Sequence, residues 1–338
     1  MPDASHSGRD AARNRGTRMA AGAPSAAALG RTAMQPTHIP WRGLRQVLRR
    51  TWREISSDRV ALSASGCAFW ATLSLFPAIS MLVSLYGLAF DPESVEPQLE
   101  NIRHLLPPPA FALIAERVRT LVSHPGATLG VSLVISTAVT LWSASTGTKS
   151  LLSALNLAYE EQEQRGFLRF QAIGLLMTFG AILGGILGLA ALVLLPAVIA
   201  FVGLSAYAKG LLQLGSLVVL VGFVLVALSL LYRFGPSRRV ARWRWVTPGS
   251  VVATLLWLLA SVLFSVYVQH VASYDATYGP LGAVAGIMLW FWGTAYVVLL
   301  GAELNAELEL QTAEDTSAGL PRPPGARGAF VADHVAED

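Results

Sequence analysis

The chain has 338 residues, of which 53% are hydrophobic and only 14% charged, and its formal net charge is +4. Its mean hydropathy of +0.51 is too high for an ordinary water-soluble domain, so a soluble globule is excluded as the starting class. The single cysteine, Cys67, lies in an apolar segment and the six histidines are scattered, so the sequence predicts no disulfide, no metal site and no cofactor.

The N-terminal region divides into two parts. Residues 1–40 are rich in Ala, Gly, Ser and Arg without an apolar run, which predicts a disordered basic cytoplasmic tail. In residues 41–57, apolar side chains recur every three or four positions and arginines occupy the other faces. This pattern predicts an amphipathic helix lying on an anionic membrane surface. Nucleic-acid binding is the alternative, but we favour the interfacial helix because a membrane span follows it.

Six stretches are long and apolar enough to cross the roughly 30 Å hydrocarbon core of a bilayer as helices. They lie near residues 61–90, 127–147, 170–200, 210–232, 246–270 and 279–302. The sequence therefore predicts an all-α fold, a polytopic membrane bundle of six transmembrane helices within residues 58–309.

The distribution of Lys and Arg predicts which side of the membrane each connection faces, because cytoplasmic connections carry an excess of both. Of the 25 Lys and Arg residues, 21 fall in the N-terminal region, the C-terminal tail and the connections at 148–169 and 233–246. All four segments lie on one side of a six-span bundle, so both termini are expected in the cytoplasm. Residues 310–338 are expected to form a disordered cytoplasmic tail, and the outer connection, 91–126, is expected to be helical.

A row of polar and small residues runs along the first span. Ser63, Trp70, Ser74 and Pro77 fall on one helical face, where they could line a solute path through the bundle. The alternative is helix packing, in which small residues allow close approach and serines bond back to their own helix; we favour it.

The connection before the sixth span contains a carboxylate surrounded by hydroxyl groups. Tyr274, Asp275, Thr277 and Tyr278 lie directly before a Gly-Pro turn. Asp275 could bind a cation or a polar head group or relay a proton, or it could cap the helix that follows. Both interpretations remain open.

The sixth span ends in a polar motif that predicts an interfacial anchor. Glu303 and Asn305 lie at this end, and Arg238 and Arg239 lie in the 233–246 connection on the same side. We expect Glu303 to pair with an arginine of that connection, as charges at exposed helix ends often do.

Several motifs, taken in order, resemble the YihY/BrkB family of bacterial inner-membrane proteins. They are the S-L-F-P of Ser74–Pro77, the W-S-A-S that begins at Trp142, the L-N-L-A-Y of Leu155–Tyr159, the Y-R-F-G-P-S-R-R of Tyr232–Arg239, the S-Y-D-A-T-Y-G-P-L-G of Ser273–Gly282 and the G-A-E-L-N-A-E of Gly301–Glu307. The likeness covers about residues 45–309. Two positions depart from it, since Asp275 stands where many relatives have Asn and Pro280 where Ser is common.

The resemblance implies a six-helix protein of the bacterial inner membrane. The family has also carried the label ribonuclease BN, but the sequence lacks the clustered metal ligands that such hydrolysis requires. No nucleophile and base, paired catalytic carboxylates or nucleotide-binding loop is present either, so we expect no enzyme activity.

Our leading functional hypothesis is a transporter or flippase-like protein for a lipid or other amphipathic solute. Its expected partners are membrane lipids, anionic ones at the cytoplasmic face, and no nucleic acid. The alternative is a non-transporting scaffold that organises proteins or lipids of the envelope. A homo-oligomer is compatible with the glycine series Gly180, Gly184 and Gly188, as is a monomer.

Overall fold

The computed structural model of the chain describes residues 26–89, 126–201, 206–270 and 280–336. Every regular element in these ranges is a helix, and the β contact within them is a single isolated bridge between Ala241 and Ser317. The expected all-α fold is therefore confirmed for the described part of the chain.

The first long helix, α2 (Trp41–Ser57), covers the residues of the predicted amphipathic helix. One face, which includes the buried Val47 and Arg50, packs against the last long helix, α11 (Pro280–Leu310). On another face, Trp41 and Trp52 are 71% and 77% exposed. Large uncovered apolar side chains among exposed arginines are what a helix at a membrane surface requires.

Residues 26–40 differ from the disordered tail predicted for residues 1–40. They form two short 3-10 helices, η1 (Ala26–Leu29) and η2 (Pro36–His38), and bury Leu29. They are held by the residues that follow α11, because Gln311 donates a hydrogen bond to the Leu29 carbonyl oxygen at 2.7 Å. The prediction was wrong here because these contacts come from the far end of the sequence, which local composition does not reveal.

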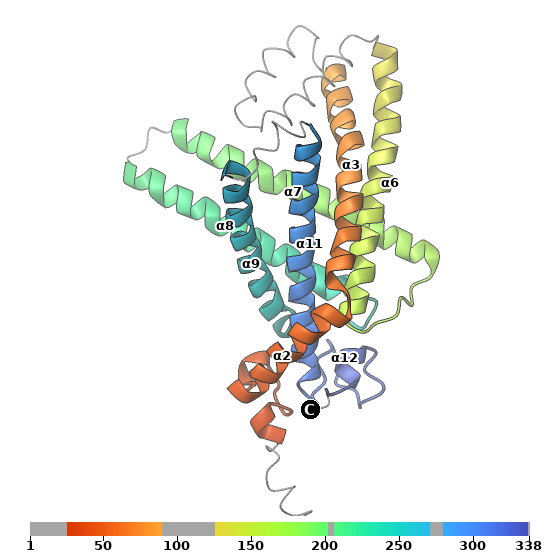
Figure 1. Cartoon of the computed structure of the whole chain (residues 1–338), viewed down its shortest axis with the longest axis vertical. Coiled ribbons are helices and arrows are strands. Elements are labelled where there is room, and N and C mark those ends of the chain that lie inside the picture. Colours follow the sequence, from red (N-terminus) through yellow and green to blue (C-terminus); the bar gives the residue numbers. More distant parts are fainter. Residues whose placement is uncertain (1–25, 90–125, 202–205, 271–279, 337–338) are drawn as a thin grey trace, which may run out of the picture.

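Two long helices form the most extensive pair in the bundle. They are α3 (Val60–Ala89) and α6 (Gly126–Ala158), which run side by side along their length (Figure 1). Small residues make the close approach possible. A Cβ atom added at Gly147 of α6 would lie 3.3 Å from the Cβ of Trp70 on α3.

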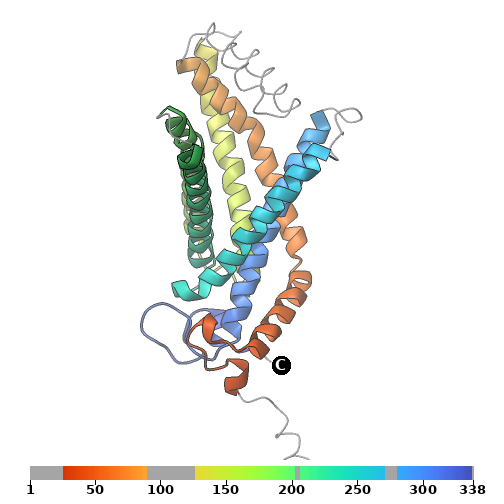
Figure 2. The same ribbon diagram turned by 90° about the vertical axis from the view of Figure 1, so that its left-hand side faces the viewer.

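Four further long helices complete the bundle: α7 (Phe167–Phe201), α8 (Ala206–Phe234), α9 (Trp243–His270) and α11. Figure 2 shows α7 and α8 side by side, with α9 and α11 forming a second group next to α3. Successive long helices from α3 to α11 run alternately away from and back towards the end where α2 lies (Figure 1). We call this the basal end; α12 (Phe330–Asp333) lies there too.

Five of these helices contain segments long and apolar enough to cross a membrane. They are Val60–Ala78, Phe167–Gly184, Leu217–Phe234, Trp243–Val268 and Val284–Leu310. In the described part of α6, predicted to supply a sixth span, no such segment is found. The structure therefore supports a polytopic helical membrane protein and leaves the count of six and the cytoplasmic termini as predictions.

Residues 311–336 differ from the disordered C-terminal tail predicted for 310–338. This segment turns back along α11, and the Ala336 amide donates a hydrogen bond to the Leu310 carbonyl oxygen at 3.0 Å. Val331 is fully buried, and the Arg327 guanidinium donates to the carbonyl oxygens of Ala313 and Ala332. The prediction failed because backbone and arginine contacts, rather than an apolar run, hold the segment in place.

Candidate functional site

The polar end of α11 is buried on all sides at the basal end. Residues 301–312 are all buried, although half of them are polar or charged. The polar and charged members are Glu303, Asn305, Glu307, Glu309, Gln311 and Thr312. Buried charges are costly unless they are paired and hydrogen-bonded, so each of them should have a partner from a neighbouring segment.

The deepest ion pair joins Arg238, in the connection between α8 and α9, to Glu309. Two nitrogens of the guanidinium donate to the two carboxylate oxygens, at 3.0 and 2.8 Å, and the side chains are only 1% and 0% exposed. The Thr316 hydroxyl donates to the same carboxylate at 2.6 Å, and the Arg238 guanidinium lies over the Tyr159 ring. Burial lowers the pKa of Arg238, but the Glu309 carboxylate outweighs this and raises the pKa above its ordinary value.

A second buried ion pair joins α2 to α11. Arg50 Nε donates to the Glu307 carboxylate at 2.5 Å, and another guanidinium nitrogen donates to Gln311 Oε1 at 2.7 Å. This pair holds the face of α2 that carries Arg50 against α11, while the other arginines of α2 stay exposed. It therefore fixes the position of the amphipathic helix on the bundle.

The closest approach of α9 and α11 lies at two glycines. A Cβ at Gly249 would lie 2.1 Å from the Gly301 carbonyl oxygen, and one at Gly301 would lie 2.5 Å from the Tyr232 hydroxyl. Asn305 then joins the helices, since its Oδ1 accepts from the Gly249 amide at 2.7 Å and its Nδ2 donates to the Val246 carbonyl oxygen at 3.0 Å. The G-A-E-L-N sequence is thus a crossing point with its own hydrogen bonds.

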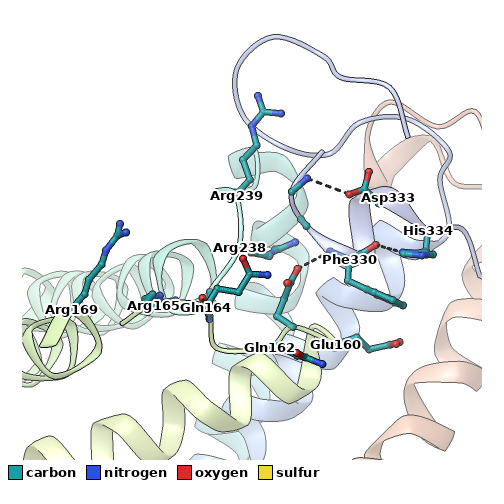
Figure 3. A pocket seen from close by; sticks show the side chains of 14 residues that line it. Glu160, Gln162, Gln164, Arg165, Arg169, Arg238, Arg239, Phe330, Asp333 and His334 are labelled. Carbon is teal, nitrogen blue, oxygen red and sulfur yellow. Dashed lines mark hydrogen bonds between the residues drawn. The ribbon is translucent and has the colours of Figure 1, made fainter. Parts of the chain in front are cut away.

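A polar pocket of about 660 Å³ opens at the basal end beside these ion pairs. It lies between the link from α6 to α7, the connection that carries Arg238, and the C-terminal segment (Figure 3). We call it the arginine pocket, and its lining consists of Glu160, Glu161, Gln162, Gln164, Arg165, Arg169, Ser237, Arg238, Arg239, Gly328, Ala329, Phe330, Asp333 and His334.

Two acidic residues of the arginine pocket are already engaged by backbone amides. The Glu161 carboxylate accepts from the Phe330 amide at 2.7 Å. The Asp333 carboxylate accepts from the amides of Gly325, Arg327 and Gly328, at 2.6, 3.0 and 3.2 Å. These carboxylates therefore hold the C-terminal segment against the pocket, and neither forms an ion pair with Arg165 or Arg169 among the described residues.

Arg165 and Arg169 form the basic wall of the pocket on the α7 side. Arg165 donates to the Gly235 carbonyl oxygen at 2.6 Å and lies 3.4 Å from the Glu163 carboxylate, but another of its nitrogens is buried without a hydrogen-bond partner. Burial lowers the pKa of Arg165; the Glu163 carboxylate opposes this shift and the Arg169 charge adds to it. Arg169 is exposed, and Figure 3 shows it extending from α7 at the edge of the pocket. Two adjacent arginines, of which only Arg165 has an ion-pair partner among the described residues, together with a buried N–H group that lacks an acceptor, favour an anion.

The structure places the predicted anchor residues differently from expectation. Glu303 is buried and does not pair with the 233–246 connection; Arg238 pairs with Glu309 instead, so that prediction was wrong. Glu309 lies further along α11 than Glu303, beyond residue 302, where the sequence predicted the end of the span. Arg239 lies 3.8 Å from the Asp315 carboxylate and lines the arginine pocket.

The predicted polar row on the first span lies on α3 and serves several roles. The Ser74 hydroxyl donates to the Ala71 carbonyl oxygen of its own helix at 2.8 Å, and Trp70 packs at the α6 seam. Ser63 lines a small cavity near Glu303, and Pro77 lies inside α3.

The hydroxyl-rich turn before the sixth span is not part of the described structure. Tyr274, Asp275, Thr277 and Tyr278 lie outside the described residues, as does the predicted helical connection at 91–126.

Sequence reasoning missed the arginine pocket and the partners of the two ion pairs. Arg165 and Arg169 were counted only as positive charges, and Arg50 only as part of a basic face. The signal that could have found them is the spacing of Glu307, Glu309 and Gln311, because polar residues on several faces of an apolar helix need partners on several sides.

Comparison with known proteins gives a consistent set of relatives. The family model described as virulence factor BrkB matches residues 51–324. The Bacillus subtilis protein named ribonuclease-like protein YfkH is 32% identical over 255 residues, 71% of this chain and 87% of its own. A UPF0761 membrane protein of Pseudoalteromonas translucida is 24% identical over 262 residues, 77% of this chain and 84% of its own. No solved structure matches the chain.

Proposed function

Because the chain belongs to the BrkB family of membrane proteins, we propose that it binds the anionic head group of a lipid or similar amphiphile in the arginine pocket and carries that molecule across the membrane. The proposal places the protein in the cytoplasmic membrane of a bacterium with six spans, α6 included. It places the basal end in the cytoplasm. The excess of Lys and Arg in the segments of the basal end supports this orientation.

The observation that carries the proposal is the position of the basic wall at the start of an apolar helix. Phe167 and Leu168, next to Arg169, are 74% and 81% exposed, and the first candidate span of α7 begins at Phe167. A head group in the pocket would leave its acyl chain beside this apolar surface. Such an arrangement of charge and apolar surface suits an amphiphile better than a small soluble anion.

The test is exchange of a labelled anionic phospholipid between the leaflets of protein-containing vesicles. We expect faster exchange than in protein-free vesicles, and a slower rate when Arg165 and Arg169 are both replaced by Gln. Arg244→Gln is the matched control, since Arg244 is an exposed arginine that does not line the pocket. Exchange no faster than in protein-free vesicles would overturn the transport proposal.

Binding without exchange would instead favour the alternative, a scaffold that organises anionic lipid. The specific observation behind it is the C-terminal segment, which closes one side of the pocket through the bonds to Glu161 and Asp333. A head group held there would be fixed beside the protein's own tail.

The name of the Bacillus subtilis relative raises nuclease activity as a third possibility. That name belongs to the relative. Within the residues that the structure describes, no three His, Cys, Asp or Glu side chains form a group that could hold a metal ion. We therefore propose no enzyme activity for this chain.

A further inference from the structure

A pair of carboxyl groups outside the arginine pocket joins the turn between α2 and α3 to α11. Asp58 caps the end of α2, and the next residue, Arg59, has a φ of +51° that turns the chain into α3. This turn directs Asp58 towards Glu303 on α11, and the two side chains line the same small cavity, close enough for their carboxyl groups to share a hydrogen bond.

The contact has a direct chemical consequence. An ionised carboxylate has only acceptor oxygens, so a hydrogen bond between two carboxyl groups requires a proton on one of them. Glu303 is only 2% exposed, and its Oε1 atom has no hydrogen-bond partner. A second negative charge would therefore have no water to stabilise it.

The arginines nearby do not neutralise the pair, because they have other partners. Arg50 binds Glu307 and Gln311, and Arg53 lies 3.2 Å from the Glu54 carboxylate. Within the described residues neither Asp58 nor Glu303 forms an ion pair.

Most of the charges that surround the pair are negative. Glu54 on α2 and Glu307 on α11 act on the pair, and Glu160 after α6 interacts with Asp58, whereas Arg50 and Arg53 on α2 act on Glu307. Burial and the Glu54 charge raise the pKa of Asp58 above its ordinary value, while the hydrogen bond from Glu303 acts in the opposite direction. The surroundings therefore favour retention of a proton.

The space around the pair decides which cation fits. Asp58 and Glu303 line a small cavity with Ser63, Leu157 and Leu299, and it has no room for a water molecule. A hydrated metal ion is therefore too large. We propose that Asp58 and Glu303 form a proton-binding site at the basal end, in which the Glu303 carboxyl group donates a hydrogen bond to the Asp58 carboxylate.

The test is infrared spectroscopy of the full-length protein in lipid at neutral pH, read at the C=O stretch of protonated carboxyl groups. We expect this band in the wild type and its loss in Glu303→Gln, because the Gln amide can donate the same hydrogen bond while Asp58 stays ionised. Glu314→Gln, which changes an exposed carboxylate, should leave the band unchanged. A band that survives in Glu303→Gln, or is missing from the wild type, would overturn the proposal.

Thermal stability as a function of pH gives an independent measurement. The folded pair retains a proton that the unfolded chain releases near the ordinary carboxyl pKa, 4.5 for Glu. The wild type should therefore lose stability as the pH rises from this value through the pKa of the folded pair. Glu303→Gln should lose clearly less stability over the same pH range. An equal loss of stability in both proteins would contradict a shared proton.

Discussion

Arginines occur in two different settings at the basal end. Arg50 and Arg238 are buried, and each is bonded to a glutamate of α11. Arg165 and Arg169 lie at the start of α7, where one has a buried nitrogen without a partner and the other is exposed. The same residue type therefore occurs in two roles. Arg50 and Arg238 stabilise the packing against α11, whereas Arg165 and Arg169 are available to an anion in the pocket.

The difference shows that burial and pairing, rather than charge alone, separate the two roles. A paired arginine in the core can be lost only at a cost in folding, because its partner is left as an isolated buried charge. An arginine on the pocket wall leaves no buried charge behind, because Glu163, the ion-pair partner of Arg165, is exposed, and Arg169 has no ion-pair partner among the described residues. Substitutions in the two settings should therefore affect different quantities, stability in the first and ligand binding in the second.

The largest effect is expected for Glu309→Ala. It removes the partner of Arg238 and leaves a buried guanidinium uncompensated, which costs about 3–5 kcal/mol for a buried pair. The measurement is thermal or denaturant unfolding of the purified protein in detergent. Glu314→Ala is the control, because Glu314 is exposed. Equal stability of the two variants would show that the ion pair has no structural role.

A smaller loss of stability is expected for Asn305→Leu. The substitution keeps the size of the side chain but removes the bonds to the Gly249 amide and the Val246 carbonyl oxygen. The Val246 carbonyl oxygen still accepts from the Ser250 hydroxyl at 2.8 Å, so the loss of the bond to the buried Gly249 amide dominates and costs about 1–3 kcal/mol. The same unfolding assay measures this loss of stability. An unchanged midpoint of unfolding would mean that the glycine contacts alone hold α9 against α11.

Arg169→Gln tests an arginine of the pocket wall, where ligand binding rather than stability should change. We expect unchanged unfolding, together with about tenfold weaker binding of an anionic amphiphile, equivalent to ~1.4 kcal/mol. Binding to protein in neutral detergent micelles is the measurement, repeated at high salt, where the difference between variant and wild type should shrink. Lower stability with unchanged binding would assign Arg169 to the structural group.

The smallest effect is expected for Ser74→Ala. The Ser74 hydroxyl bonds to a carbonyl oxygen of its own helix, so its loss strands no partner. The change in unfolding free energy should stay within about 0.5 kcal/mol, and lipid exchange should be unaffected. Slower exchange with normal stability would revive the solute path predicted along the first span.

Much of the architecture was predictable from the sequence because the apolar stretches are long. The helices and the extent of α2 follow from runs and periods that are local in sequence, and the family follows from short motifs. The partners of the polar residues at the end of α11 could not be predicted in this way. Its residues Glu307 and Glu309 look like the exposed end of a helix, and only the fold brings Arg50 and Arg238 to them.

The folded ends of the chain were missed for a related reason. Residues 26–40 and 311–336 have few apolar side chains, and composition alone predicts disorder for them. They are held instead by bonds to carbonyl oxygens and amides across a long separation in sequence, such as Gln311 to Leu29. Contacts of this kind leave no periodic signal.

The measurement that tests the central claim most directly is native mass spectrometry of the protein released from membranes with its bound lipid. It compares the wild type with the Arg165→Gln, Arg169→Gln double variant and with Arg244→Gln. The account predicts a defined anionic amphiphile on the wild type and on Arg244→Gln that is lost from the double variant. Equal retention of the same lipid by all three proteins, or none on any, would contradict it.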